Sequence, residues 1–230
     1  MAIIIPHRFK DRISSPANKK IDTIIIGTFN PGLPITEKLS ASEIKEFSKI
    51  SSSSKFQKFN QIQNFYDRSQ NRFWKVMDVI YNSEFYSDED LKKKNPLGLK
   101  YFSGMDRAAV LKRQLDFCFQ NNIWITDIVS EIRPKTFLNI YDYFPDTFIE
   151  KSDCEFNTNS ILKVIKSFKV KKVVFTFRPN RNSIPKISRQ IQFLIANSTA
   201  DFNFGMSTSG AAKNTYERLV KDWKVLLDNE

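Results

Sequence analysis

The strongest indication of the fold is the segment Ile24-Ile25-Ile26-Gly27-Thr28-Phe29-Asn30-Pro31-Gly32. It starts with β-branched apolar residues and stops at Gly, Asn, Pro and Gly, a pattern that predicts a buried strand entering a tight loop. A strand that is apolar on both faces is typical of a parallel sheet covered by helices on each side. Ligands of such sheets bind beyond the carboxyl ends of the strands, where this loop is expected.

Asn30 is the only side chain of this loop that offers both a hydrogen-bond donor and an acceptor. It can therefore hold a polar ligand. It can equally be a turn residue that tolerates an unusual backbone angle. This segment alone leaves both interpretations open.

Three further strands are predicted, each in an apolar run that is separated from the next by residues at helical spacing. They cover residues 123–129, 170–177 and 201–206. Helices are expected near 41–47, from residue 73, over 106–121 and 160–168, after Ser183, and from Tyr216 to Leu227. Alternating strands and helices predict an α/β fold, a three-layer α/β/α sandwich with a central, mainly parallel four-stranded sheet. We expect one domain over residues 1–230, with a polar and mobile surface insertion at about 33–64.

The composition is that of a basic globular protein. Lys and Arg number 36 against 25 acidic residues, which gives a formal charge of +11. Hydrophobic residues make up 41% and aromatic residues 13% of the chain, too many for a disordered protein. The charge balance favours a polyanionic partner such as nucleic acid, although a basic surface without such a partner is the alternative.

Several classes of site are disfavoured by residues that are rare in this chain. Cys118 and Cys154 are the only cysteines and no secretory leader is recognised, so reduced thiols and a cytoplasmic location are expected. No apolar run approaches the ~20 residues needed to cross a bilayer. His7 is the sole histidine and lies in an N-terminal tail, which argues against a catalytic triad or a histidine metal site. We expect neither a metal nor a cofactor.

Three loops are expected at strand ends: Gly27–Gly32, Phe65–Arg72 and Ser207–Ala212. They contain no histidine, no glycine-rich phosphate motif and no paired carboxylates. They supply one amide, aromatic rings and a hydroxyl-rich turn. These groups suit the binding of a flat heterocycle by stacking and edge hydrogen bonds, with small residues against a phosphate backbone.

In these loops the chain resembles the uracil-DNA glycosylase superfamily, most closely its mismatch-specific (thymine/uracil) branch. The first motif of that branch, Gly-Ile-Asn-Pro-Gly, is similar to Gly27-Thr28-Phe29-Asn30-Pro31-Gly32, which has one extra residue. Its aromatic residue followed by Asn-Arg-Phe-Trp corresponds to Tyr66 and Asn71-Arg72-Phe73-Trp74. Its second motif, Asn-Pro-Ser-Gly, aligns with Ser207-Thr208-Ser209-Gly210.

The resemblance implies a monofunctional DNA glycosylase, a hydrolase of N-glycosyl bonds that acts in base excision repair. Asn30 would hold the attacking water, and Tyr66, or Phe65 if the register differs by one, would stack on the flipped base. The base edge would meet backbone groups near Gly27, Thr28, Phe29 and Pro31. The DNA contacts would be Ser207, Thr208, Ser209 and Gly210 on phosphates, and Ala211, Ala212 and Lys213 near the gap in the duplex. The partner would be duplex or single-stranded DNA, bound by a monomer with no membrane association.

The second motif departs from the mismatch-specific branch because it lacks the leading asparagine and the proline. Its Ser-Thr-Ser core resembles the hypoxanthine-glycosylase branch, whose first motif has a Gly-Ser-Phe pattern similar to Gly27-Thr28-Phe29 but no asparagine. Base preference among uracil, hypoxanthine, xanthine and mispaired thymine is therefore open. A non-catalytic nucleic-acid binding protein on the same scaffold is the alternative.

Some charged residues near the predicted strand ends have a structural interpretation as well. Asp127 and Arg133 could line the site, but a loop cap and a surface ion pair are favoured. Arg72 is interpreted as a surface charge at a helix start, and Arg178 and Arg181 as solvated or phosphate-binding arginines.

Overall fold

The structure is a computed structural model that describes residues 3–68, 71–92, 101–102, 106–137, 140–141, 146–177, 184–209 and 214–227. Its centre is a four-stranded sheet in the order β3-β2-β6-β7, with every neighbouring pair parallel. The strands are β2 (Thr23–Gly27), β3 (Ile123–Asp127), β6 (Lys172–Phe175) and β7 (Asp201–Phe204). The predicted α/β class and the positions of all four strands are confirmed.

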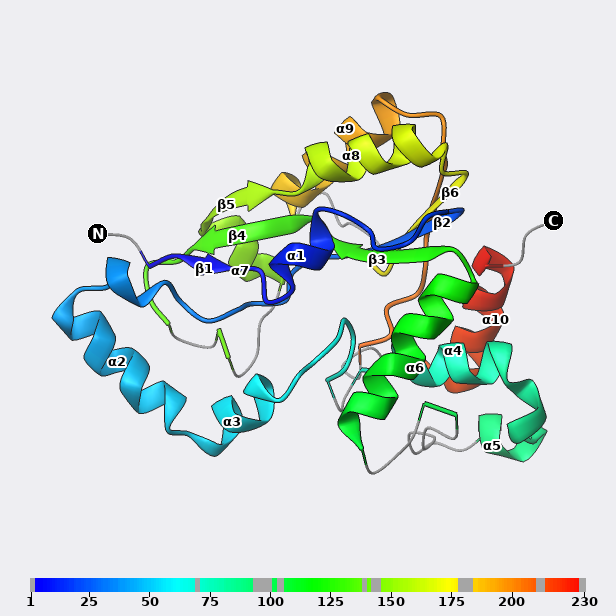
Figure 1. Cartoon of the computed structure of the whole chain (residues 1–230), viewed down its shortest axis with the longest axis horizontal. Helices are drawn as coiled ribbons and strands as arrows, with labels where there is room; N and C mark the ends of the chain where they lie inside the picture. The colour runs from blue at the N-terminus through cyan, green and yellow to red at the C-terminus, as the bar shows by residue number, and fades with distance from the viewer. Residues whose placement is uncertain are drawn as a thin grey trace.

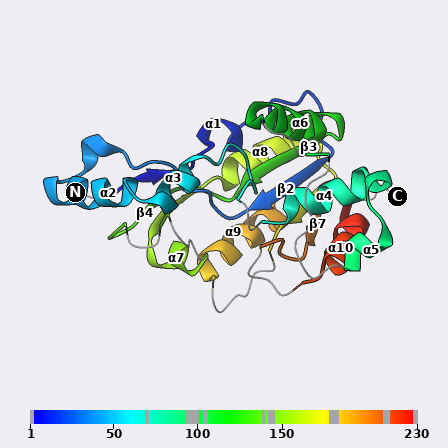
Figure 2. The same ribbon diagram turned by 90° about the horizontal axis from the view of Figure 1, so that it is seen from below.

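Helices cover both faces of this sheet because successive residues of its strands point to opposite sides. Ile24 and Ile26 of β2 pack into one core cluster with α8 (Thr158–Phe168) and α9 (Pro185–Ala196). Ile25 packs into the other cluster with α4 (Phe73–Tyr81), α6 (Arg107–Gln120) and α10 (Tyr216–Leu227). Figure 1 shows these two helix layers above and below the sheet, and Figure 2 views the same arrangement from below.

A second sheet, which the sequence did not predict, is antiparallel and has the order β1-β4-β5. Its strands are β1 (Ile5–Pro6), β4 (Val129–Arg133) and β5 (Asp153–Phe156). Because β4 begins two residues after β3 ends, β1 is brought to the carboxyl edge of the parallel sheet. There His7 forms an isolated bridge with Pro31. The segment predicted to be a tail is therefore part of the sheet architecture.

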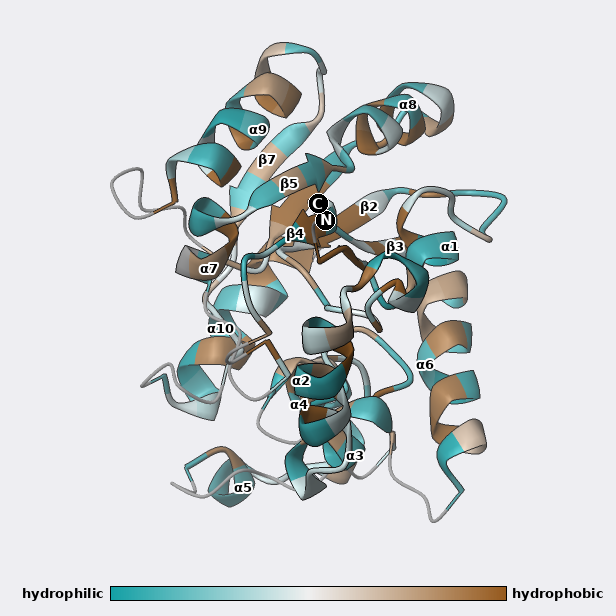
Figure 3. Ribbon diagram, turned by 90° about the vertical axis from the view of Figure 1, so that its left-hand side faces the viewer, coloured by the Kyte–Doolittle hydropathy of each residue, from teal (hydrophilic) through white to brown (hydrophobic). Residues whose placement is uncertain are grey.

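The insertion at 33–64 is largely helical, with more helix than the single short helix predicted near 41–47, and part of it packs on the core. It contains η1 (Thr36–Lys38), α2 (Ala41–Ser51) and α3 (Ser54–Asn60). The predicted capping box of Ser40 and Glu43 is present, and α2 continues beyond residue 47. Phe56 and Phe59 are 5% and 7% exposed and lie 5.1 and 5.2 Å from the ring of Tyr141. Figure 3 shows hydrophobic colour on β2 and β4, with α2 and α3 lying below them in that view.

The remaining short elements are α1 (Lys10–Ile13), η2 (Ser83–Phe85), α5 (Asp88–Lys92) and α7 (Asp146–Lys151). Cys118 and Cys154 are free thiols. Within the part of the chain that the structure describes, no helix combines the length and the apolar character needed to cross a membrane.

The packing of the insertion predicts its contribution to stability. Phe56→Ala is expected to lower the free energy of unfolding by about 3 kcal/mol, because it leaves a cavity between α3 and Tyr141. Ile44→Ala on α2, where the side chain is 47% exposed, is the matched control and is expected to change it by about 0.5 kcal/mol or less. Urea denaturation of both variants measures the difference. Equal effects would show that the insertion does not pack on the core.

Candidate functional site

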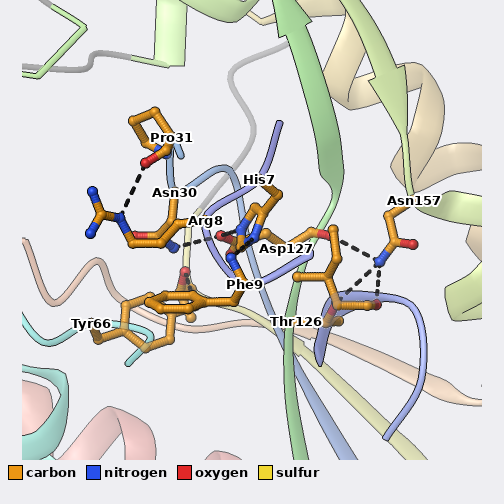
Figure 4. Close-up of polar contacts among 11 residues, drawn as sticks. His7, Arg8, Phe9, Asn30, Pro31, Tyr66, Thr126, Asp127 and Asn157 are labelled. Atoms are coloured by element: carbon orange, nitrogen blue, oxygen red, sulfur yellow. Dashed lines mark hydrogen bonds and ion pairs between the residues drawn. The ribbon is translucent and has the colours of Figure 1, made fainter. Parts of the chain in front are cut away.

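The site is centred on the carboxylate of Asp127, the last residue of β3 and the register partner of Gly27 at the end of β2. Asp127 is 1% exposed. Its Oδ2 accepts hydrogen bonds from Asn30 Nδ2 at 2.6 Å and from His7 Nε2 at 2.8 Å, as Figure 4 shows. A carboxylate can only accept, so the amide nitrogen of Asn30 must face it. The amide oxygen of Asn30 accepts from no described residue and is available to a ligand.

His7 has one defined tautomer in this arrangement. The backbone N–H of Phe9 donates to His7 Nδ1 at 2.9 Å, so Nδ1 carries no proton. Nε2 therefore carries the proton and donates it to Asp127. The imidazole is 2% exposed and its ring centre lies 5.6 Å from that of Phe29 and 5.8 Å from that of Phe65. His7 is therefore a buried hydrogen-bond donor that fixes the position of the Asp127 carboxylate.

Buried polar groups also fix the backbone of Asp127. Asn157, which precedes α8, donates through Nδ2 to Thr126 Oγ1 at 3.1 Å and to the Asp127 carbonyl at 3.3 Å. The Thr126 hydroxyl donates to the Ile13 carbonyl at the end of α1 at 2.9 Å. All three polar side chains are buried, so the end of β3 is a rigid support for the carboxylate.

Tyr66, from another loop, approaches Gly27 on the same side as the Asp127 carboxylate. A Cβ placed on Gly27 would lie 2.3 Å from Asp127 Oδ1 and 2.6 Å from Tyr66 Oη, so both groups approach the glycine closely. Tyr66 has a φ of 59°, which is unfavourable for a bulky residue, and its ring centre lies 4.5 Å from that of Phe73. Its hydroxyl donates to Thr176 Oγ1 at 3.3 Å.

The chemistry of these groups follows from their burial. Desolvation, and then the negative charge of Asp127, raise the pKa of Tyr66, so its hydroxyl remains a donor. Asp127 Oδ1 is buried and accepts no hydrogen bond from the described residues. The site therefore has an acceptor-only oxygen that a ligand or a water could satisfy.

A second carboxylate, Asp146 of α7, lies beside the Gly27–Gly32 loop. Its pKa is raised by burial and further by the charge of Asp127, while a hydrogen bond with the Thr28 side chain opposes the shift. Two carboxylates in different environments are a common basis for separate acid and base roles.

The hydroxyl-rich turn is held to the Phe65–Arg72 loop by Arg72. The backbone N–H of Arg72 donates to the Thr208 carbonyl at 2.8 Å. Its guanidinium donates to the carbonyls of Ser209, at 3.2 Å, and Asn214. Arg72 is 8% exposed, which corrects its interpretation as a surface charge. Thr208 is also buried, with its hydroxyl donating to Asn71 Oδ1 at 3.0 Å, and so presents no hydroxyl to a phosphate.

The structure brings together Gly27, Thr28, Asn30 and Tyr66 around Asp127. Ser207 is half-buried and Ser209 exposed, and the turn that carries them is attached through Arg72 and Asn71.

The remaining predicted site residues lie in the core, are joined to the β1 segment, or are outside the described residues. Phe29 and Phe65 are 6% and 3% exposed in the core, so Phe65 offers no free face for stacking. Pro31 is joined to the β1 segment, and its carbonyl accepts from Arg8 Nε at 3.3 Å. Gly210, Ala211, Ala212, Lys213, Arg178 and Arg181 lie outside the described residues.

His7 and Asp146 are site residues that the sequence interpretation missed, and Asp127 was considered as a site residue but assigned to a loop cap. Asp127 had a usable signal, because it ends a predicted strand just as the Gly27–Gly32 loop does. His7 had none, since it is separated from Asp127 by 120 residues. Arg133 forms exposed ion pairs with Glu131 and Glu155, as the surface interpretation predicted.

Comparisons of the chain with protein-family models, with curated proteins and with solved structures give no significant match. The resemblance of its three loops to the uracil-DNA glycosylase superfamily therefore stays a prediction.

The tautomer of His7 can be checked directly because the chain has one histidine. We expect the ¹⁵N NMR shifts of the imidazole near neutral pH to show a protonated Nε2 and an unprotonated Nδ1, as the bond from Phe9 requires. A spectrum with Nδ1 protonated would contradict the arrangement around Asp127.

A double-mutant cycle measures the strength of the His7–Asp127 bond. His7→Ala and Asp127→Ala are expected to show a coupling of about 2 kcal/mol in unfolding free energy, because a buried hydrogen bond to a charged group contributes ~1.5–3 kcal/mol. Lys112 and Asp116, an exposed pair on α6 with a separation of 2.6 Å, are the control, with an expected coupling of about 0.5 kcal/mol or less. A coupling no larger than that of the control would contradict a structural role for His7.

Proposed function

We propose that the chain is a monofunctional DNA glycosylase that hydrolyses the N-glycosidic bond of uracil, or of a related deaminated or mispaired base, flipped out of DNA for base excision repair. The observation that carries the proposal is the bond from Asn30 Nδ2 to Asp127 Oδ2. This bond leaves the amide oxygen of Asn30 without a described donor, and Tyr66, from a loop distant in sequence, approaches Gly27 beside the same carboxylate.

In the proposed reaction a water donates one hydrogen bond to Asn30 Oδ1 and attacks C1′ of the sugar. An amide is not a base, so Asn30 positions the water and does not take its proton. The C1′–N bond breaks first, and the base leaves with the electron pair while Asp127 is still an anion. The attacking water then gives its proton to Asp127 Oδ1, the carboxylate oxygen without a described partner, and from there the proton passes to the departed base. The balance is the addition of one water across the bond.

The electrostatics of the site suit the proposed transition state. The sugar becomes positively charged as the bond breaks, and a buried anionic carboxylate stabilises that charge without reorganisation. The Tyr66 ring, held at a positive φ against Phe73, would stack on the extruded base. Extrusion costs a few kcal/mol and least at mispairs, which favours damaged or mismatched sites.

We further propose that the protein acts as a cytoplasmic monomer on DNA. The formal charge of +11 supports a polyanionic substrate.

The test is base release from oligonucleotides that contain uracil, hypoxanthine, xanthine or a T·G mispair, with alkali used to cleave abasic sites. Asn30→Ala is expected to reduce turnover by about 100-fold or more on the preferred base, since one preorganised polar group commonly contributes that much. DNA affinity should be kept, and the unfolding free energy is expected to fall by about 1–3 kcal/mol, because the Asp127 side chain keeps only the donor from His7 among the described residues. Asn197→Ala, on the exposed end of α9, is the control with no expected effect on turnover.

If no abasic site forms on any of these bases, the enzymatic proposal is wrong. Salt-dependent DNA binding without base release would then support a non-catalytic nucleic-acid binding protein. Equal loss of affinity and turnover in Asn30→Ala would indicate misfolding of the loop rather than loss of a catalytic group.

A further inference from the structure

Arg8, the residue after His7, is a partly buried cation with neutral partners only. Its Nε donates to the Pro31 carbonyl at 3.3 Å, and its Nη1 donates to the carbonyls of Asn60 and Ile62 at 3.2 and 3.4 Å. Its Nη2 is buried and has no hydrogen-bond partner among the described residues. The guanidinium lies 4.2 Å from the ring centre of Phe59, and Figure 4 shows it beside Asn30 and Pro31.

Arg68, two residues after Tyr66, approaches the same aromatic ring. Its guanidinium lies 5.3 Å from the ring centre of Phe59 and is half-buried. Its side chain donates to no described residue. Neither arginine forms an ion pair with a described carboxylate; Asp127 affects the charge of Arg68 only at longer range. Two guanidinium groups without an ion-pair partner among the described residues therefore lie beside the Phe59 ring, one bonded to Pro31 of the Asn30 loop and one close after Tyr66.

The positive charges of Arg8 and Arg68 repel each other. Burial, and then the charge of Arg68, lower the pKa of Arg8 to about 10, which leaves it protonated at neutral pH. Burial also lowers the pKa of Arg68. Bringing two cations together at a partly desolvated place is unfavourable unless an anion joins them.

We propose that Arg8 and Arg68 form a phosphate-binding site that holds a backbone phosphodiester of the DNA strand next to Asn30. The free donors of two planar guanidinium groups match the oxygens of a phosphate. The pair joins the two loops that would hold the sugar and the base, so the phosphate would be one adjacent to the flipped nucleotide. This inference rests on the proposed function for the identity of the strand, but it requires binding and not base release.

The test uses Arg68→Gln, because the Arg68 side chain supports no described hydrogen bond and its loss should leave the fold intact. The probe is a duplex oligonucleotide with a tetrahydrofuran abasic analogue, which has no base to release. The logarithm of the DNA-binding constant is plotted against the logarithm of the salt concentration. The slope of this plot is expected to be less steep by about 0.9 for Arg68→Gln than for the unchanged protein, which is the effect of one lost phosphate contact. Arg68→Lys, which keeps the charge, should restore most of the slope.

The matched control is Lys166→Gln in the last turn of α8, at the opposite edge of the parallel sheet, where one exposed cation is removed. Its slope should equal that of the unchanged protein. If the slope of Arg68→Gln also equals that of the unchanged protein, the proposal is wrong. Tight binding of inorganic phosphate or thymidine monophosphate that is lost in Arg68→Gln, with no change in DNA binding, would assign the pair to a small ligand and also overturn it. If the slopes change as expected but no base is released, only the proposed glycosylase activity is rejected.

Discussion

The buried carboxylate of Asp127 is the constraint on which the arrangement of the site depends. An isolated anion inside a protein costs several kcal/mol unless donors surround it. Here the donors come from His7 and Asn30, separated from Asp127 by 120 and 97 residues. Satisfying this one group requires that the β1 segment cross the carboxyl edge of the parallel sheet, and it also fixes the direction of the Asn30 amide. The small antiparallel sheet that carries β1 and β4 is therefore the support of a polar centre and not a separate unit.

A similar dependence on buried donors joins the other loops. Arg72 links the start of α4 to the hydroxyl-rich turn through three carbonyl groups, and Arg8 links the β1 segment to the end of α3. Each guanidinium replaces hydrogen bonds that loop carbonyls would otherwise make with water. Two of the buried polar atoms without described partners, Asp127 Oδ1 and Arg8 Nη2, belong to residues that hydrogen-bond with Asn30. A ligand whose sugar is attacked by water and carries a phosphate complements both atoms: the water can donate to Asp127 Oδ1, and the phosphate can accept from Arg8 Nη2.

The features that could be predicted from the sequence are those with a local cause. The run Ile24–Ile26 is apolar on both faces because helices cover both sides of β2, and Ser40 and Glu43 cap α2 through bonds within one turn. Asn30 and Tyr66 could be predicted as site residues because they belong to short motifs at the end of a strand and before the start of a helix. Helix α3 and its packing were missed because Phe56 and Phe59 are buried by Tyr141, which is distant in the chain. The two-residue strand β1, which includes Pro6, is too short for periodicity to show, and the His7–Asp127 pair has no local signal at all.

The separation of His7 from Asp127 also sets the order of events during synthesis. A ribosome adds roughly 5–20 residues per second, so His7 waits for several seconds before its partner carboxylate has been made. During that interval β1 has no β4 to pair with, and the Asn30 amide has no acceptor to orient it. The nascent chain can form α2 and α3 early, but the polar centre closes only when the β3–β4 segment has emerged. Translation pauses before that segment should therefore prolong the exposure of the unpaired edge of β1.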